Sequence, residues 1–164
     1  MTEAQSPAKP KYTIKRRLIR AAVIIVVAYV FFSRVLLPLR IKGISMEPTY
    51  HSGRPNFCFR LRYLFSSPAR QDIVLIRLAG GRVAYLKRVI GLPGDTVEFR
   101  DGKLFVNDQE VDEPYTTEEC DWNMEPVTVR AGNVYVVGDN RAVSIDDHVF
   151  GQTSIKRVMG SPIW

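Results

Sequence analysis

The feature that most constrains this chain is an apolar run near its N-terminus. Residues 21–32 contain no charged side chain, and the run continues to residue 39 with Arg34 as its single charge. About 20 apolar residues are enough for a helix to span a bilayer. Arg34 lies toward the end of the run, where its long side chain can reach the membrane interface. We therefore predict a transmembrane helix over residues 18–39, with a separate domain over residues 41–164.

A cleavable signal peptide is the alternative interpretation, because a basic segment precedes a short apolar core. No small-x-small cleavage pattern follows the run directly, which favours a retained signal anchor. Basic residues in front of an anchor place the N-terminus in the cytoplasm. We expect residues 1–17 to form a cytoplasmic basic tail and residues 41–164 to lie outside.

The net charge of +6 does not indicate a nucleic-acid-binding protein. Residues 1–40 carry eight basic side chains and one acidic one, whereas residues 41–164 carry 15 basic and 16 acidic ones. The excess of positive charge therefore belongs to the anchor and its tail. No other feature of the sequence favours nucleic acid as a partner.

The segment after the anchor has the pattern of a mainly β domain. Short runs rich in β-branched and aromatic residues alternate with turn signals, and we predict strands over residues 55–61, 72–78, 82–90, 96–100, 103–106, 127–129, 133–137 and 152–159. Asp101-Gly102 predicts a hairpin turn, and residues 107–109 predict another. The acidic segment 114–126 lacks alternation and is interpreted as a surface loop. Length indicates one domain of this kind.

The two cysteines and two histidines give weaker signals. An external location permits a disulfide between Cys58 and Cys120. Cys58 lies in an apolar strand, where a buried free thiol is the more common outcome. His51 and His148 do not have the spacing of metal ligands, so we expect no metal. Nothing in the sequence implies an organic cofactor.

Lys87 lies in the middle of a predicted apolar strand. Residues 85–91 of this strand read Tyr-Leu-Lys-Arg-Val-Ile-Gly. Burial disfavours the ammonium form and lowers the pKa of a lysine. A neutral lysine is a general base. An edge lysine facing solvent is the ordinary alternative for a single residue of this kind. Because a general base needs a partner to deprotonate, Lys87 directs attention to nucleophiles elsewhere in the chain.

Two other stretches complete an ordered set of motifs. Residues 45–49 read Ser-Met-Glu-Pro-Thr, and residues 138–146 read Gly-Asp-Asn-Arg-Ala-Val-Ser-Ile-Asp. Together with residues 87–95 (Lys-Arg-Val-Ile-Gly-Leu-Pro-Gly-Asp) and the anchor, this order resembles the type I signal peptidases, which are membrane-bound Ser/Lys endopeptidases. The resemblance covers residues 18–160. It implies a twisted fold of packed antiparallel β-sheets.

The resemblance also implies roles for individual residues. Ser45 matches the nucleophile, Lys87 the general base and Ser144 the serine that orients the lysine. Some members of the family add an oxyanion-stabilising hydroxyl two residues before the nucleophile, where this chain has Gly43. By position, Ile44, Tyr85 and Leu86 are expected to line the pockets for an extended substrate peptide. Core packing is the alternative for Leu86.

The chain departs from the family pattern after Ser144. The family reads Ser-x-Asp-Ser-Arg, with a supporting ion pair between the Asp and the Arg, whereas this chain has Asp147 and His148 at the last two positions. We expect His148 to replace the arginine as an imidazolium beside Asp146, and an exposed His148 without any role in the site is the alternative. Such a pair is charged only when the histidine is protonated.

The expected function is removal of signal peptides from exported precursors, after small-x-small sites. The expected partners are the lipid bilayer and preprotein signal peptides, and the expected oligomeric state is a monomer. Lys87 favours the bacterial branch over the endoplasmic reticulum branch, which uses histidine, and hence the bacterial inner membrane. A dedicated maturation peptidase of the same chemistry and a non-catalytic signal-peptide-binding module are the competing hypotheses.

Overall fold

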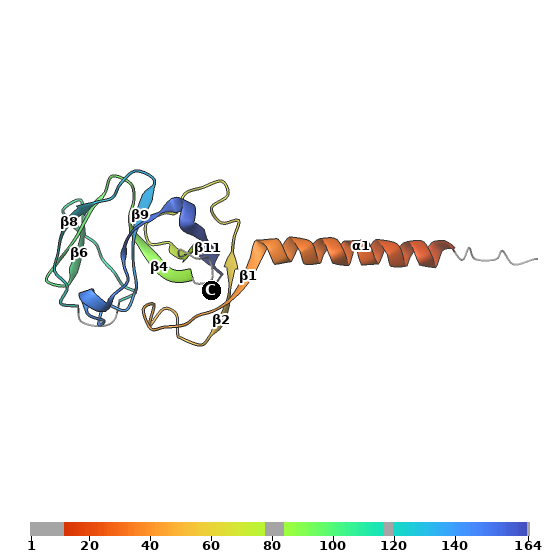
Figure 1. Ribbon diagram of the computed structural model, residues 1–164, viewed down its shortest axis with the longest axis horizontal. Helices are drawn as coiled ribbons and strands as arrows, with labels where there is room; N and C mark the ends of the chain where they lie inside the picture. Colours follow the sequence, from red (N-terminus) through yellow and green to blue (C-terminus); the bar gives the residue numbers. More distant parts are fainter. Residues whose placement is uncertain (1–11, 78–83, 117–119, 164) are drawn as a thin grey trace, which may run out of the picture. The chain divides into compact units, whose positions relative to one another are not determined.

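The computed structural model describes residues 12–77, 84–116 and 120–163 (Figure 1). The chain divides into two compact units between Val35 and Leu36. The first unit contains helix α1 (Tyr12–Val35), and its segment Ile14–Val35 is long and apolar enough to cross a membrane. The helix ends four residues before the predicted end of the span. Pro38 explains this difference, because proline lacks a backbone N–H and disfavours helical geometry in the residue before it.

The second unit is built from two antiparallel β-sheets. The larger sheet has seven strands in the order β1-β2-β11-β3-β4-β9-β10. Its strands are β1 (Leu36–Arg40), β2 (Pro55–Phe59), β3 (Ile73–Arg77), β4 (Ala84–Gly91), β9 (Asn133–Val137), β10 (Gly151–Ser154) and β11 (Val158–Pro162). The predicted fold class, a mainly antiparallel β domain with one N-terminal apolar helix, is confirmed.

The smaller sheet has four strands in the order β7-β6-β5-β8. They are β5 (Thr96–Arg100), β6 (Lys103–Val106), β7 (Gln109–Glu110) and β8 (Met124–Thr128). Two short 3-10 helices, η1 (Ile145–Asp147) and η2 (Ile155–Arg157), complete the described elements. The segment predicted as a loop over residues 114–126 therefore contains the start of a strand, and the single predicted strand over residues 152–159 is divided between β10, η2 and β11.

Both predicted hairpin turns are present in the smaller sheet. Asp101 and Gly102 join β5 to β6 with φ angles of 48° and 79°, and Asn107 and Asp108 join β6 to β7 with φ angles of 55° and 64°. Two successive residues with positive φ form the turn that matches the natural twist of a hairpin. The first turn sets the register that pairs Val97 with Val106, and the second sets the register that pairs Val106 with Gln109.

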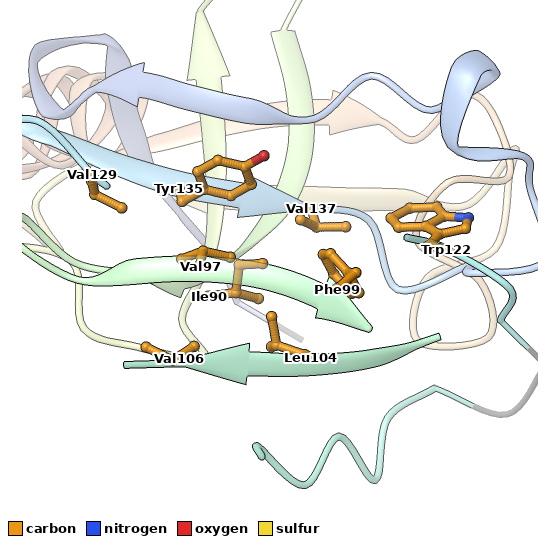
Figure 2. Packing of buried hydrophobic residues seen from close by; sticks show 9 residues of the cluster. All are labelled: Ile90, Val97, Phe99, Leu104, Val106, Trp122, Val129, Tyr135 and Val137. Atoms are coloured by element: carbon orange, nitrogen blue, oxygen red, sulfur yellow. The ribbon is translucent and has the colours of Figure 1, made fainter. Parts of the chain in front are cut away.

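Strand β4 contributes to all three apolar clusters of the domain through Leu86, Val89 and Ile90. The largest cluster packs the smaller sheet against the larger one, and Figure 2 shows nine of its side chains. They are Ile90, Val97, Phe99, Leu104, Val106, Trp122, Val129, Tyr135 and Val137. Because β4 is paired on both sides, by β3 and by β9, it is a central strand with a fixed position.

The two cysteines are free thiols. Cys58 is fully buried on β2, and burial raises its pKa to about 11. Of the two alternatives, a disulfide or free thiols, the structure contains free thiols. A thiol with a raised pKa carries little thiolate at neutral pH and is correspondingly unreactive.

Candidate active site

Lys87 lies in the centre of β4, opposite Val74 of β3. Its side chain is buried, at 3% exposure, in a domain core formed largely by apolar residues. This burial lowers the pKa of the lysine to about 8, although the nearby Asp139 carboxylate partly opposes the shift. Within the described residues, Lys87 forms no salt bridge. The prediction of a buried lysine with a lowered pKa is confirmed.

Ser45 lies in a compact turn between β1 and β2. The backbone N–H of Glu47 donates to the Ile44 carbonyl at 3.0 Å, and the N–H of Tyr50 donates to the Met46 carbonyl at 2.8 Å. The Met46 side chain anchors this turn, since it is 2% exposed and packs in the same cluster as Leu86 of β4. Ser45 itself remains partly exposed. The serine is thus held on a rigid turn and is still accessible.

Asp139 connects the serine turn to the lysine strand. It accepts two hydrogen bonds from Arg88, from Nε at 2.8 Å and from Nη2 at 2.6 Å, in a buried bidentate ion pair. The same carboxylate accepts the Thr49 hydroxyl at 2.6 Å. Arg88 follows Lys87 on β4 and Thr49 lies four residues after Ser45, so one carboxylate fixes both segments. The prediction that Arg88 is structural agrees with this geometry.

The residues around Asp139 also hold the backbone of the serine. The Asn140 N–H donates to the Ser45 carbonyl at 3.1 Å, and the Asn140 side chain donates to the Ile44 carbonyl at 3.2 Å. Gly138 lies so close that an added Cβ would be 2.1 Å from the Ser45 carbonyl oxygen. Only glycine fits at this position. The segment 138–140 therefore sets the position of Ser45 relative to β4.

A second buried ion pair supports this segment from the other side. Arg141 is 2% exposed, donates from Nη1 to Glu113 at 2.7 Å, and donates from Nε to the Gly138 carbonyl at 2.9 Å. Tyr115 donates its hydroxyl to the same glutamate at 2.6 Å, and its ring lies 3.7 Å from the Arg88 guanidinium carbon. The two ion pairs thus belong to one network. The sequence motif included Asp139 and Arg141, but gave no signal for Glu113.

The predicted ion pair between Asp146 and His148 is not formed. His148 is 6% exposed, its Nε2 atom accepts the Gly138 N–H at 2.9 Å, and its Nδ1 atom has no partner among the described residues. Burial lowers its pKa to about 3, and the positive charges of Lys87 and Arg141 add to the effect. The histidine is therefore neutral, and it does not replace a charged arginine. Asp146 is exposed in η1.

Ser144 is placed at the start of η1, where it is exposed. Within the described chain, its side chain forms no hydrogen bond with Lys87 or with the backbone of η1. The predicted contact between this serine and the lysine is therefore absent from the structure. The physical reason lies in the turn, which leaves Ser144, Asp146 and Asp147 exposed, whereas Ile145 packs against the largest apolar cluster and His148 is buried.

The three residues expected to contact a substrate differ in exposure. Ile44 is 54% exposed beside the serine, and Tyr85 is half-buried on β4. Leu86 is 9% exposed and packs with Met46. It is therefore a core residue, which was the alternative to the predicted role in substrate binding. Gly43 has a φ of +92°, a backbone conformation that side chains rarely adopt, and it provides no hydroxyl. The role of these residues toward a peptide stays a prediction.

No group of three or more His, Cys, Asp or Glu side chains that could hold a metal ion occurs in the described part of the chain. The arrangement instead offers a serine on a rigid turn and a buried lysine whose pKa is close to neutrality. These are the components of a hydrolase that acts through a nucleophilic serine.

Comparison with known proteins identifies the family of this chain. Residues 14–163 match the family described as signal peptidase, peptidase S26. This chain belongs to that family. It is 37% identical over 153 residues to a signal peptidase I of Bacillus licheniformis, with 85% of this chain and 82% of that protein covered.

Two further relatives show how wide the similarity is. Signal peptidase I V of Bacillus subtilis is 33% identical over 150 residues, with 83% of this chain and 89% of that protein covered. Thylakoidal processing peptidase 1 of Arabidopsis thaliana is 33% identical over 151 residues, with 85% of this chain covered. The chain spans only 44% of that protein's length.

Proposed function

We propose that this member of the peptidase S26 family is a membrane-anchored serine endopeptidase that removes signal peptides from exported precursors. Ser45 is the nucleophile and Lys87 is the general base. Cleavage follows small-x-small sites in an extended substrate. The N-terminal tail lies in the cytoplasm and the β domain lies on the outer face of a bacterial inner membrane, in agreement with the basic residues that precede the uncharged apolar run 21–32.

One observation carries the proposal: the buried Lys87, whose pKa is about 8, lies on β4 next to Arg88, and the Asp139 carboxylate that binds Arg88 also binds Thr49 of the serine turn. A solvated lysine is almost fully protonated at neutral pH and cannot accept a proton. Burial of Lys87 makes the neutral amine accessible at a moderate free-energy cost. Because Asp139 contacts both segments, the serine and the lysine are held in one rigid unit.

The first half of the reaction forms an acyl-enzyme. The Ser45 hydroxyl oxygen attacks the scissile carbonyl carbon while the neutral Lys87 amine accepts the hydroxyl proton. When the tetrahedral intermediate collapses, the C–N bond breaks and Lys87 donates the proton to the leaving amine. The mature protein departs with its new N-terminus, and the signal peptide remains esterified to Ser45.

The second half of the reaction restores the enzyme. Lys87, again neutral, accepts a proton from a water molecule whose oxygen attacks the ester carbonyl. The ester C–O bond breaks, and the proton returns to the Ser45 oxygen. The Ser45 backbone N–H has no hydrogen-bond acceptor among the described residues, so it is available to stabilise the developing oxyanion.

The proposal is tested with the full chain in detergent–lipid micelles and a precursor that carries an Ala-x-Ala site. Wild type is expected to release the mature protein, with the cut after the second alanine established by mass spectrometry. Ser45→Ala and Lys87→Ala are each expected to reduce cleavage at least a thousandfold, because members of one catalytic unit act together. Lys156→Ala, at an exposed lysine, is the matched control.

The outcome also separates the alternatives. Unchanged cleavage by a folded Lys87→Ala protein would refute the mechanism. Binding of the precursor without cleavage by wild type would favour a non-catalytic module. A dedicated maturation peptidase has support of its own, because one relative is named a thylakoidal processing peptidase. A panel of unrelated precursors addresses it, since a general signal peptidase cleaves most of the panel and a dedicated enzyme cleaves one.

A further inference from the structure

His148 is a buried titratable residue that takes no part in the reaction described above. Its Nε2 atom accepts the Gly138 N–H at 2.9 Å, and its ring meets that of Trp122 edge-on, with 4.7 Å between the ring centroids. Trp122 is itself fixed, since its indole N–H donates to the Val143 carbonyl at 3.0 Å. The imidazole is therefore held in one orientation, with Nε2 directed at the backbone beside the serine turn.

The surroundings of His148 select one protonation state. An imidazole that accepts a hydrogen bond at Nε2 must carry its proton on Nδ1. The charged groups that face it, Lys87 and Arg141, are both basic and oppose an imidazolium. The carboxylates of the network are already paired, Asp139 with Arg88 and Glu113 with Arg141. A protonated His148 would therefore lose the Gly138 hydrogen bond and gain no partner among the described residues.

Gly138 is the point through which His148 acts. Its N–H is held by His148, its carbonyl oxygen accepts Arg141 Nε at 2.9 Å, and its Cα lies against the Ser45 carbonyl. An added Cβ at Gly138 would also lie 2.7 Å from His148 Nε2. The peptide is thus fixed on three sides, and a displacement of Gly138 would move the carbonyl of the serine.

We propose that His148 is a positioning residue of this peptidase, which acts as a neutral imidazole that holds Gly138 and, through Gly138 and Asn140, the backbone of Ser45. The inference rests on the proposed function of Ser45 as the nucleophile. It also gives the departure from the family pattern a meaning, because a hydrogen-bond acceptor now stands where the family has a charged donor. A donor such as arginine cannot accept the Gly138 N–H.

Two substitutions distinguish the hydrogen-bond acceptor of His148 from the packing of its aromatic ring. His148→Gln retains an acceptor near the Nε2 position and loses the aromatic ring, whereas His148→Phe retains the ring and loses the acceptor. Activity is measured on the full chain in detergent–lipid micelles with the Ala-x-Ala precursor. The Phe variant is expected to lower kcat at least tenfold across pH 6–10, with KM within twofold of wild type. The Gln variant is expected to stay within threefold of the wild-type kcat.

Two results would overturn the inference. One is a Phe variant with the wild-type kcat, and the other is an equal loss of kcat in the Phe and Gln variants. A second measurement remains decisive where the Phe variant fails to fold. In the His51→Gln background the remaining imidazole signals belong to His148, and its two ¹⁵N resonances identify the tautomer. The proton is expected on Nδ1 at every pH between 5 and 9. A proton on Nε2, or a charged ring within that range, overturns the inference.

These results are distinguishable from a failure of the proposed function. If wild type does not cleave the precursor, or if Ser45→Ala cleaves as well as wild type, the proposed function fails. The tautomer measurement does not depend on either result, because it reports the contact between His148 and Gly138 in the folded protein. Loss of activity in the Phe variant alone, with the Nδ1 proton present in wild type, supports the positioning role.

Discussion

Replacement of Lys87 by methionine should stabilise the protein, and the gain should depend on pH. Lys87 is 3% exposed, and its pKa falls from 10.5 in the unfolded chain to about 8 in the folded one. The unfolded state therefore binds more protons between these values, so stability rises with pH across this interval. Methionine has a similar length and no charge, so its burial carries no such dependence.

The magnitude follows from the two pKa values. A full shift of 10.5 to 8 corresponds to about 3.4 kcal/mol at about 1.36 kcal/mol per pKa unit. This free energy is the amount by which burial of the Lys87 ammonium group destabilises the folded protein. Nearly all of it, about 3.3 kcal/mol, is present in wild type at pH 7, and about 2.0 kcal/mol remains at pH 9. The stability gain of Lys87→Met is therefore expected to be larger at pH 7 than at pH 9 by about 1.3 kcal/mol.

Denaturant unfolding of the full chain in micelles measures this difference, with fluorescence of the buried Trp122 as the probe. Lys156→Met, at an exposed lysine, is the matched control and should show no change between the two pH values. A gain of Lys87→Met that is the same at pH 7 and pH 9, or a loss of stability at pH 7, would refute the assignment of a lowered pKa to Lys87. The variant should be inactive at both pH values.

Three further predictions concern the support of the site. Asp139→Asn should lower the free energy of unfolding by about 3 kcal/mol, since it leaves the buried Arg88 without its ion-pair partner, and denaturant unfolding checks this. Gly138→Ala should lower kcat at least tenfold, because its Cβ would meet the Ser45 carbonyl at 2.1 Å, and wild-type kcat would contradict the close contact. Ser144→Ala should leave the free energy of unfolding within about 0.5 kcal/mol of wild type, because the serine is exposed, and a larger change in the denaturant midpoint would reveal a contact absent from the structure.

Much of the fold could be predicted from local chemistry. The Asp-Gly turn after β5 and the Asn-Asp turn after β6 are short-range signals, and both turns form as expected. Strand β1 was not predicted, because its apolar residues continue the membrane-spanning pattern without a break. Its strand geometry depends on pairing with β2, which lies some twenty residues further along the chain, and such long-range pairing is invisible to a local pattern.

The site shows the same division between local and long-range information. Lys87 could be identified because a lysine within an apolar strand is conspicuous in the sequence itself. His148 was misinterpreted, because replacement of the family arginine suggested another cation beside Asp146. Burial decides its state, together with the positive charges of Lys87 and Arg141 and the contact with Gly138, and these depend on the fold around the residue. Glu113, which pairs with Arg141 across 28 residues, had no local signal at all.

The pH dependence of kcat/KM for wild type tests the central claim most directly. If Lys87 is the general base, only its neutral form is active, so kcat/KM should rise about tenfold per pH unit below pH 8 and level off above it. Burial of the ammonium group is the cause of that midpoint, and His148 should add no inflection between pH 5 and pH 9. A profile that continues to rise to pH 10.5, or one that is flat from pH 6 to pH 9, would contradict the account.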